Sequence, residues 1–200
     1  MIFKYIMLIL LGFLSGSILY SLILPKLFCK VDITEQFDDK NPGAANAIKS
    51  VGPYIGMLCL VLDILKGFVP VYIATRIVDY KSTLFFLIMM APVLGHAFGM
   101  FNGWQGGKAI SVTFGVLLGV IFVSIQLLLL AALYILFSTI IKIQPHARRT
   151  VLVFMLFAAI QFFLPMAFSL KLGAVVSAAI VVFKNWADAL LPSPIRLRKG

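Results

Sequence analysis

Long apolar runs alternate with short polar segments along this chain, and their spacing predicts a bundle of membrane-spanning helices. A helix needs about 20 mainly apolar residues to cross the hydrocarbon core of a bilayer. Runs of that size predict spans at 4–24, 52–75, 82–101, 151–169 and 172–190. The first run is longer than the apolar part of a secretory signal peptide, and no small-x-small cleavage site follows it. We therefore interpret it as a span.

The apolar run at 109–141 is long for one tilted helix and short for two full spans. Loop charge decides between them, because short cytoplasmic loops carry an excess of lysine and arginine. One span would leave the basic clusters at 142–149 and 196–199 outside, whereas a hairpin turning near Gly119 brings both inside. The sequence therefore predicts an all-α integral membrane protein with seven transmembrane helices, N-out and C-in, a short helical hairpin at 109–141, and a single domain over 1–200.

Composition supports this class and excludes others. Hydrophobic residues make up 62% of the 200 residues and charged residues 12%, about half the charge of a typical soluble domain. The net charge of +10 comes from cations clustered in loops, without the basic stripe and interleaved aromatics of a nucleic-acid-binding protein. The two cysteines and two histidines are scattered, so we expect no disulfide framework and no metal site.

The expected topology gathers several polar motifs on one face. In the first loop, Asn41-Pro42-Gly43 predicts a turn, and Asn46 and Lys49 follow it with an amide and a cation. These groups suit hydroxyl and phosphate oxygens. The alternative is an ordinary turn that begins the next helix.

A second motif, Gly106-Gly107-Lys108, precedes the 109–141 run. Two glycines let the backbone approach a ligand closely, and a lysine beside them completes an anion cradle. The alternative is a plain connector. His96, at the end of the third span, has the intrinsic pKa range of a general base, although a lone histidine there is also commonly structural.

Asp63 and Lys66 lie within the second span, three residues apart on one helix face. Ionisable groups inside a span are costly and by default suggest function. A self-neutralised pair that fixes helix packing is the other interpretation.

Together these motifs resemble one known family, the bacterial acyl-phosphate-dependent glycerol-3-phosphate acyltransferases of the PlsY type. The resemblance covers roughly residues 10 to 120 and six blocks in register. The blocks are Gly16-Ser17-Ile18, Val31-Asp32-Ile33, Asn41-Pro42-Gly43-Ala44 with Asn46, Asp63-Ile64-Leu65-Lys66-Gly67 with Pro70, Leu94-Gly95-His96 with Phe98 and Phe101, and Gly106-Gly107-Lys108.

The resemblance implies transfer of an acyl chain from acyl phosphate to glycerol 3-phosphate at the cytoplasmic face of the bacterial inner membrane, without a cofactor. A soluble enzyme that makes acyl phosphate is an expected partner, beside membrane lipid. Lys108 and His96 are the expected catalytic residues. The expected substrate-binding residues are Asn41, Gly43, Asn46, Lys49, Gly106 and Gly107, and the accessory candidates are Ser17, Asp39, Asp63, Lys66 and Arg149.

The chain also departs from the family pattern. Asp39 stands where the family has a serine, Lys49 replaces an arginine, and Arg148-Arg149 replace a serine-rich segment. Carboxylates beside a dianion site would repel the substrate unless Asp39 is turned away or paired with Lys40. Two alternatives therefore stay open: a paralogue that acylates a different polar acceptor, and a non-catalytic protein or anion carrier on the same scaffold.

Overall fold

The computed structural model describes residues 2–191, and this part of the chain is helical without strands. The chain begins with α1 (Ile2–Ser17) and ends, within the described part, with α9 (Phe168–Leu190). Between them lie α2 (Tyr20–Cys29), η1 (Ile33–Glu35), α3 (Ala44–Val51), α4 (Pro53–Ile77), α5 (Phe85–Phe98), η2 (Met100–Asn102), α6 (Ile110–Gly119), α7 (Gln126–Ile135), η3 (Leu136–Ile140, a π-helix) and α8 (His146–Gln161).

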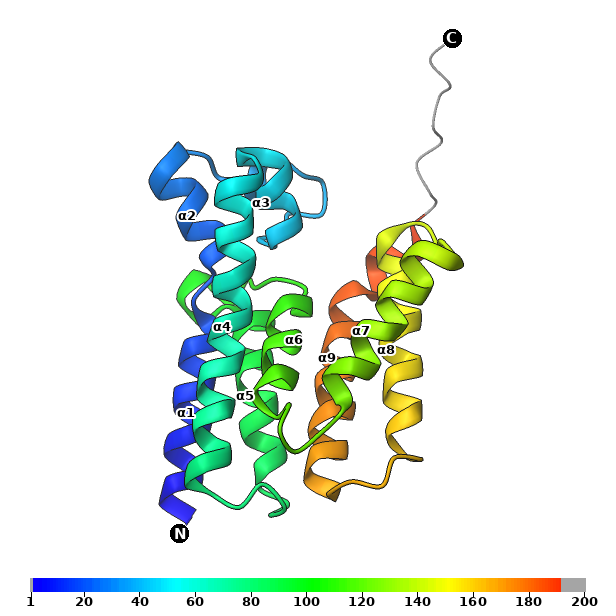
Figure 1. Cartoon of the computed structure of the whole chain (residues 1–200). Coiled ribbons are helices and arrows are strands. Elements are labelled where there is room, and N and C mark those ends of the chain that lie inside the picture. Colours follow the sequence, from blue (N-terminus) through cyan, green and yellow to red (C-terminus); the bar gives the residue numbers. More distant parts are fainter. Residues whose placement is uncertain (1, 192–200) are drawn as a thin grey trace.

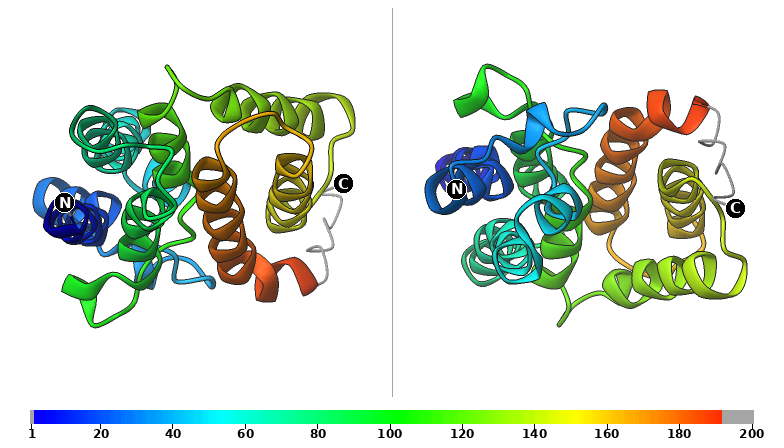
Figure 2. Two further views of the ribbon diagram at one scale, coloured as in Figure 1. Left: turned by 90° about the horizontal axis from the view of Figure 1, so that it is seen from below. Right: turned by 90° about the horizontal axis from the view of Figure 1, so that it is seen from above.

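The long helices run roughly parallel or antiparallel to one another in two groups (Figure 1). In the first group, α4 packs on α6 and α1 packs on α5; in the second, α8 packs on α9. Contact between α5 and α9 joins the groups, and the end-on views show them side by side (Figure 2). Residue 2 and the end of α9 lie at opposite ends of the bundle, which we call the N-terminal end and the α9 end (Figure 1).

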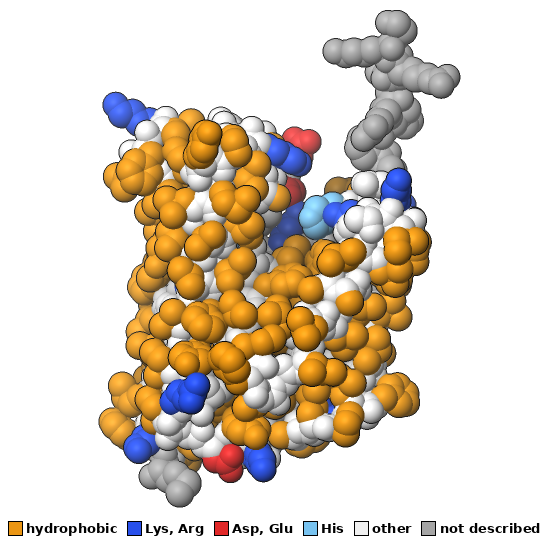
Figure 3. Space-filling model, in the orientation of Figure 1, with side chains coloured by type: hydrophobic (Ala, Val, Ile, Leu, Met, Phe, Trp, Pro, Cys, Tyr) orange, Lys and Arg blue, Asp and Glu red, His pale blue; other side chains and the backbone are white. Residues whose placement is uncertain are grey.

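Apolar side chains cover much of the face seen in Figure 3, as expected for a protein surrounded by lipid. Within residues 2–191, α4, the segment 85–102 and α9 are long and apolar enough to span a bilayer, and α1 with α2 form a fourth candidate if counted as one bent span. The expected all-helical membrane architecture is confirmed at this level.

The first span is not the continuous helix predicted for 4–24. The helix breaks at residues 18–19 and bends by 40° between α1 and α2. The break frees the Ile18 carbonyl, which accepts a hydrogen bond of 2.6 Å from Lys66 Nζ. A buried lysine thus supplies the donor that the interrupted helix lacks.

The same lysine forms an ion pair with Asp63, at 2.7 Å, and Asp63 also accepts a hydrogen bond of 2.7 Å from Ser21 of α2. The Asp63 and Lys66 side chains are each only 1% exposed. The geometry favours the structural interpretation of this pair, because both residues hold the break between α1 and α2.

Helices α1 and α5 cross closely at Gly16, the glycine of the Gly16-Ser17-Ile18 motif. A Cβ on Gly16 would lie 2.1 Å from the Pro92 carbonyl oxygen, so only glycine allows this approach. The neighbouring Ser17 is fully buried and donates to the Phe13 carbonyl at 2.8 Å. The Ser17 hydroxyl therefore forms a hydrogen bond within α1 and does not face the cleft.

The segment 109–141 forms the predicted hairpin. Helix α6 ends at Gly119, as expected, and α7 begins at Gln126 and continues into η3. The bounds of the next span were wrong, because α8 begins at His146 and ends at Gln161. Arg148 and Arg149 of the basic cluster at 142–149 therefore lie in the first turn of α8, and Lys142 lies in the segment before it. The tail cluster at 196–199 lies outside the described residues.

Candidate functional site

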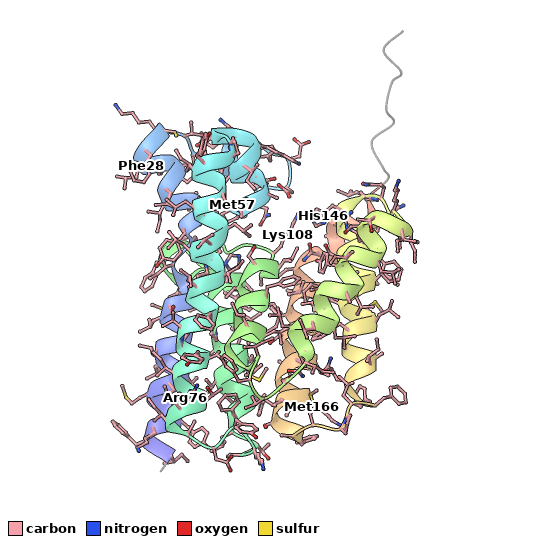
Figure 4. The ribbon with its side chains drawn as sticks, in the orientation of Figure 1. Phe28, Met57, Arg76, Lys108, His146 and Met166 are labelled. Carbon is pink, nitrogen blue, oxygen red and sulfur yellow. The ribbon has the colours of Figure 1, made fainter. Side chains whose placement is uncertain are left out.

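A polar cleft of about 480 Å³ opens at the α9 end of the bundle, between the two groups of helices. Figure 3 shows charged side chains and a histidine gathered there, and Figure 4 shows Lys108 and His146 directed toward it from opposite sides. Its lining residues are Phe37, Asp38, Asp39, Asn46, Lys49, Lys108, Pro145, His146, Ala147, Asp188 and Leu191.

Lys108 is the cation that pairs with two of the carboxylates in this cleft. Its Nζ is 2.6 Å from Asp39 Oδ2 and 2.7 Å from Asp188 Oδ2. Burial alone lowers the pKa of Lys108, but hydrogen bonds and charge from the two carboxylates outweigh it, so its pKa lies above the usual value. Lys108 is therefore a permanent cation at physiological pH.

Asp39 belongs to the loop that precedes α3. It accepts hydrogen bonds from Asn46 Nδ2 at 3.0 Å and from the Asn41 amide at 3.3 Å, in addition to its bond from Lys108. Burial raises the pKa of Asp39, but these bonds and the lysine charge bring it below the usual value. Asp39 is neither turned away from the cleft nor paired with Lys40, because its carboxylate lines the cleft and binds Lys108, which offsets its charge.

The asparagines and Gly43 shape this loop from within. Asn46 Nδ2 also donates to the Asn41 carbonyl at 3.1 Å, and the Gly43 amide donates to the same carbonyl at 2.8 Å. Gly43 then precedes α3, where its carbonyl accepts from the Asn46 amide. These groups hold Asp39 in place, and of the three only Asn46 lines the cleft.

Gly106 and Gly107 lie against the end of α5. The Gly107 amide donates to the His96 carbonyl at 3.0 Å, so it is not free to bind a phosphate as the cradle hypothesis required. A Cβ on Gly106 would lie 2.1 Å from the His96 carbonyl oxygen, and a Cβ on Gly107 2.4 Å from His96 Nε2. The glycines therefore let the loop pack on His96 and carry Lys108 to the cleft.

His96 lies beneath this loop and does not line the cleft. It is 3% exposed, and its Nδ1 has no hydrogen-bond partner among the described residues. The position fits the expected ordering of the loop better than direct acid–base work on a substrate in the cleft.

Two further cations approach the cleft from different helices. Lys49 lines it from α3. Arg149 lies in the first turn of α8, which begins at His146. The cleft thus contains Lys108 and Lys49, and Arg149 lies on the helix that contributes His146 and Ala147 to its lining.

Sequence reasoning missed Asp188 and His146. Asp188 comes from the last helix and His146 from the first residue of α8, both far from Lys108 in sequence. The predicted topology, which put the ends of both segments on the same face as Lys108, was the available signal. The accessory candidates Ser17, Asp63 and Lys66 lie elsewhere, inside the α1–α4–α5 packing.

Comparison with known proteins supports a relationship over nearly the whole chain. The family model described as glycerol-3-phosphate acyltransferase matches residues 6–190. Among curated relatives, the glycerol-3-phosphate acyltransferase of Thermotoga petrophila is 42% identical over 107 residues, 54% of each chain. That of Nitratidesulfovibrio vulgaris is 39% identical over 112 residues, covering 56% of this chain and 33% of the relative. The chain spans about half the length of the first of these relatives and a third of the second.

The fold is also similar to a solved one. Crystal structures of PlsY, an integral membrane glycerol 3-phosphate acyltransferase, were matched in their glycerol 3-phosphate and lysophosphatidic acid forms. The TM-scores are 0.81 and 0.79 at 23% identity, with 92% of this chain and 90% and 89% of the PlsY chains covered. This likeness concerns the fold. The family-model match, which extends from α1 to the end of α9, places the chain in the glycerol-3-phosphate acyltransferase family.

Proposed function

We propose that this protein transfers an acyl group from acyl phosphate to the 1-hydroxyl of glycerol 3-phosphate, giving lysophosphatidic acid. The hydroxyl oxygen attacks the acyl carbonyl carbon, the bond from that carbon to the phosphate oxygen breaks, and inorganic phosphate leaves with the proton lost from the hydroxyl. Acyl phosphate is already activated. The protein must therefore mainly hold two anions in register and stabilise developing negative charge.

The observation that carries the proposal is the pair Lys108 and Lys49, which face one cleft from separate elements. Family membership supplies the reaction type, and the cleft supplies cations for phosphate groups. In the proposed site, Lys108 and Lys49 bind the phosphates, with Arg149 strengthening the field from the edge.

The other candidate residues would act by positioning these cations. Gly106 and Gly107, packed on His96, direct the Lys108 loop, while Asn41, Gly43 and Asn46 hold the loop that carries Asp39. In this proposal the two glycines position Lys108 and do not bind phosphate through their backbone amides, because the Gly107 amide already donates to the His96 carbonyl.

We further propose that the chain crosses the bacterial inner membrane seven times, with the cleft on the cytoplasmic side. The alternating direction of α1, α4, α5, α6, α7, α8 and α9, together with the basic loops near the cleft, supports this arrangement. A cytoplasmic cleft would receive glycerol 3-phosphate from solution and acyl phosphate from a soluble enzyme. Labelling of a cysteine introduced at Gln144, in a Cys29→Ser background that leaves only the buried Cys59, tests this. Labelling from outside intact cells would refute the orientation.

A different acceptor remains the second candidate, because three carboxylates line the cleft: Asp38, Asp39 and Asp188. The hydroxyl groups of a sugar-like headgroup, or the N–H groups of a cationic one, could donate hydrogen bonds to these carboxylates, and a cationic group could also form ion pairs with them. The assay should therefore offer glycerol 3-phosphate beside glycerol and a cationic amino alcohol.

The deciding experiment incubates purified protein with acyl phosphate and each acceptor, and measures both phosphate release and the acylated product. We expect lysophosphatidic acid only when glycerol 3-phosphate is present. Phosphate release without acylated product would indicate mere hydrolysis, and product with another acceptor alone would replace the proposed substrate.

A further inference from the structure

The Lys108 ammonium is shared by two carboxylates from distant parts of the chain. Asp39 reaches it from the loop before α3, and Asp188 reaches it from the last turn of α9. Both carboxylate side chains are 28% exposed, and both line the cleft. Two of the three N–H donors of the ammonium are thus taken, so a substrate phosphate that needs more than the third donor must displace one of these carboxylates.

The two carboxylates are not held equally. Asp39 has two partners besides Lys108, the Asn46 side chain and the Asn41 amide. Within residues 2–191, Asp188 has Lys108 as its one recorded ion-pair or hydrogen-bond partner. Asp188 also lies two residues before the C-terminus of α9, where the helix dipole disfavours negative charge. A ligand should therefore displace Asp188 from Lys108 more easily than it displaces Asp39.

We infer that Asp188 occupies the place of a substrate phosphate on Lys108, and that it thereby restricts the cleft to doubly charged phosphate groups. The substrate part of this inference rests on the proposed function. The Asp188 carboxylate is itself a monoanion, so a monoanionic ligand that displaces it gains no charge at Lys108. A dianionic phosphate carries twice the charge of the carboxylate and attracts the Lys108 ammonium more strongly. This stronger attraction can offset the loss of the contact between Asp188 and Lys108.

The test measures anion binding without turnover. Inorganic phosphate, which is mostly a dianion at about pH 8, and acetate are titrated by calorimetry into the purified protein in detergent. Asp188→Asn should bind phosphate about 3- to 10-fold more tightly, a charged hydrogen bond discounted for partial exposure. Acetate, for which the wild type should show no measurable binding, should then bind detectably.

Three variants control the interpretation. Asp188→Glu keeps the competing charge and should restore the weak binding seen with Asp188. Asp79→Asn removes a carboxylate from the exposed loop between α4 and α5, at the other end of the bundle, and controls for net charge. Lys108→Met should abolish the gain when combined with Asp188→Asn. A thermal unfolding curve verifies that each variant is folded.

Unchanged or weaker phosphate binding in folded Asp188→Asn would overturn the inference, as would equal tightening in Asp79→Asn. The result also separates this inference from the proposed function. Tighter phosphate binding in a protein that forms no lysophosphatidic acid would refute the reaction but leave the role of Asp188 intact. Normal formation of lysophosphatidic acid, with phosphate binding unaffected by Asp188→Asn, would support the reaction and refute the role of Asp188.

Discussion

Replacing Lys108 with methionine separates the catalytic from the structural contribution of this side chain. The substitution keeps the length of the apolar stem and removes the charge. It breaks two ion pairs, but the carboxylates are 28% exposed and the lysine 18% exposed, so water can hydrate the freed groups. Partly exposed pairs contribute about 1 kcal/mol or less each, and the fold should survive.

Activity should suffer far more. Removing an electrostatic donor from a reaction centre typically costs about 3–4 kcal/mol of transition-state stabilisation, which lowers kcat/KM by roughly 150- to 900-fold. The assay measures lysophosphatidic acid formed from acyl phosphate, with Lys81→Met, in the exposed loop after α4, as the matched control. A folded Lys108→Met protein within about fivefold of wild-type kcat/KM would refute the assignment of Lys108.

Two further predictions concern the Lys108 loop and its titration. Gly107→Ala places a Cβ 2.4 Å from the buried His96 ring, so turnover should fall at least about tenfold with little change in helix content by circular dichroism. The raised pKa of Lys108 and the lowered pKa of Asp39 set the pH window of their ion pair. Its stabilisation is present above the ordinary Asp39 pKa of 3.8 and below the ordinary lysine pKa of 10.5, and is lost as pH leaves that window. A pH profile of the thermal midpoint should therefore show no step from this pair between about pH 6 and 9; a step that disappears in Lys108→Met would contradict this.

Periodic features of the sequence predicted the fold well. Apolar run length located most of the long helices, and the distribution of basic residues favoured the hairpin that α6 and α7 form around the Gly119 turn. The break at residues 18–19 was not predicted, although Ser15-Gly16-Ser17 come directly before it, because the whole run 4–24 was long and apolar enough for one span. The Ile18 carbonyl freed at the break is bound by Lys66, 48 residues away in sequence, a tertiary contact that the local pattern does not show.

The candidate site was predicted less completely, because its chemistry depends on contacts between distant segments. Lys108, Lys49 and Asn46 were identified from local motifs and do line the cleft. Asp188 has no motif around it, and only the folded chain reveals that α9 brings it to Lys108. The backbone role of Gly107 was misjudged for a similar reason, since its amide is bonded to a carbonyl on α5.

The Asp63–Lys66 pair holds the chain at the break between α1 and α2. Both side chains are 1% exposed, so removing one partner leaves a buried charge uncompensated, at a cost of about 3–5 kcal/mol. Lys66→Met also leaves the Ile18 carbonyl without its donor, and so loosens α2 and the loop that follows it toward Asp39. We therefore expect Lys66→Met to lower the thermal midpoint strongly, and the double variant Asp63→Leu with Lys66→Met to regain part of the loss, because no isolated charge remains. If the double variant is as unstable as the sum of the two single variants, the pair is not coupled, and the break between α1 and α2 must be held by packing against α4 and α5 alone.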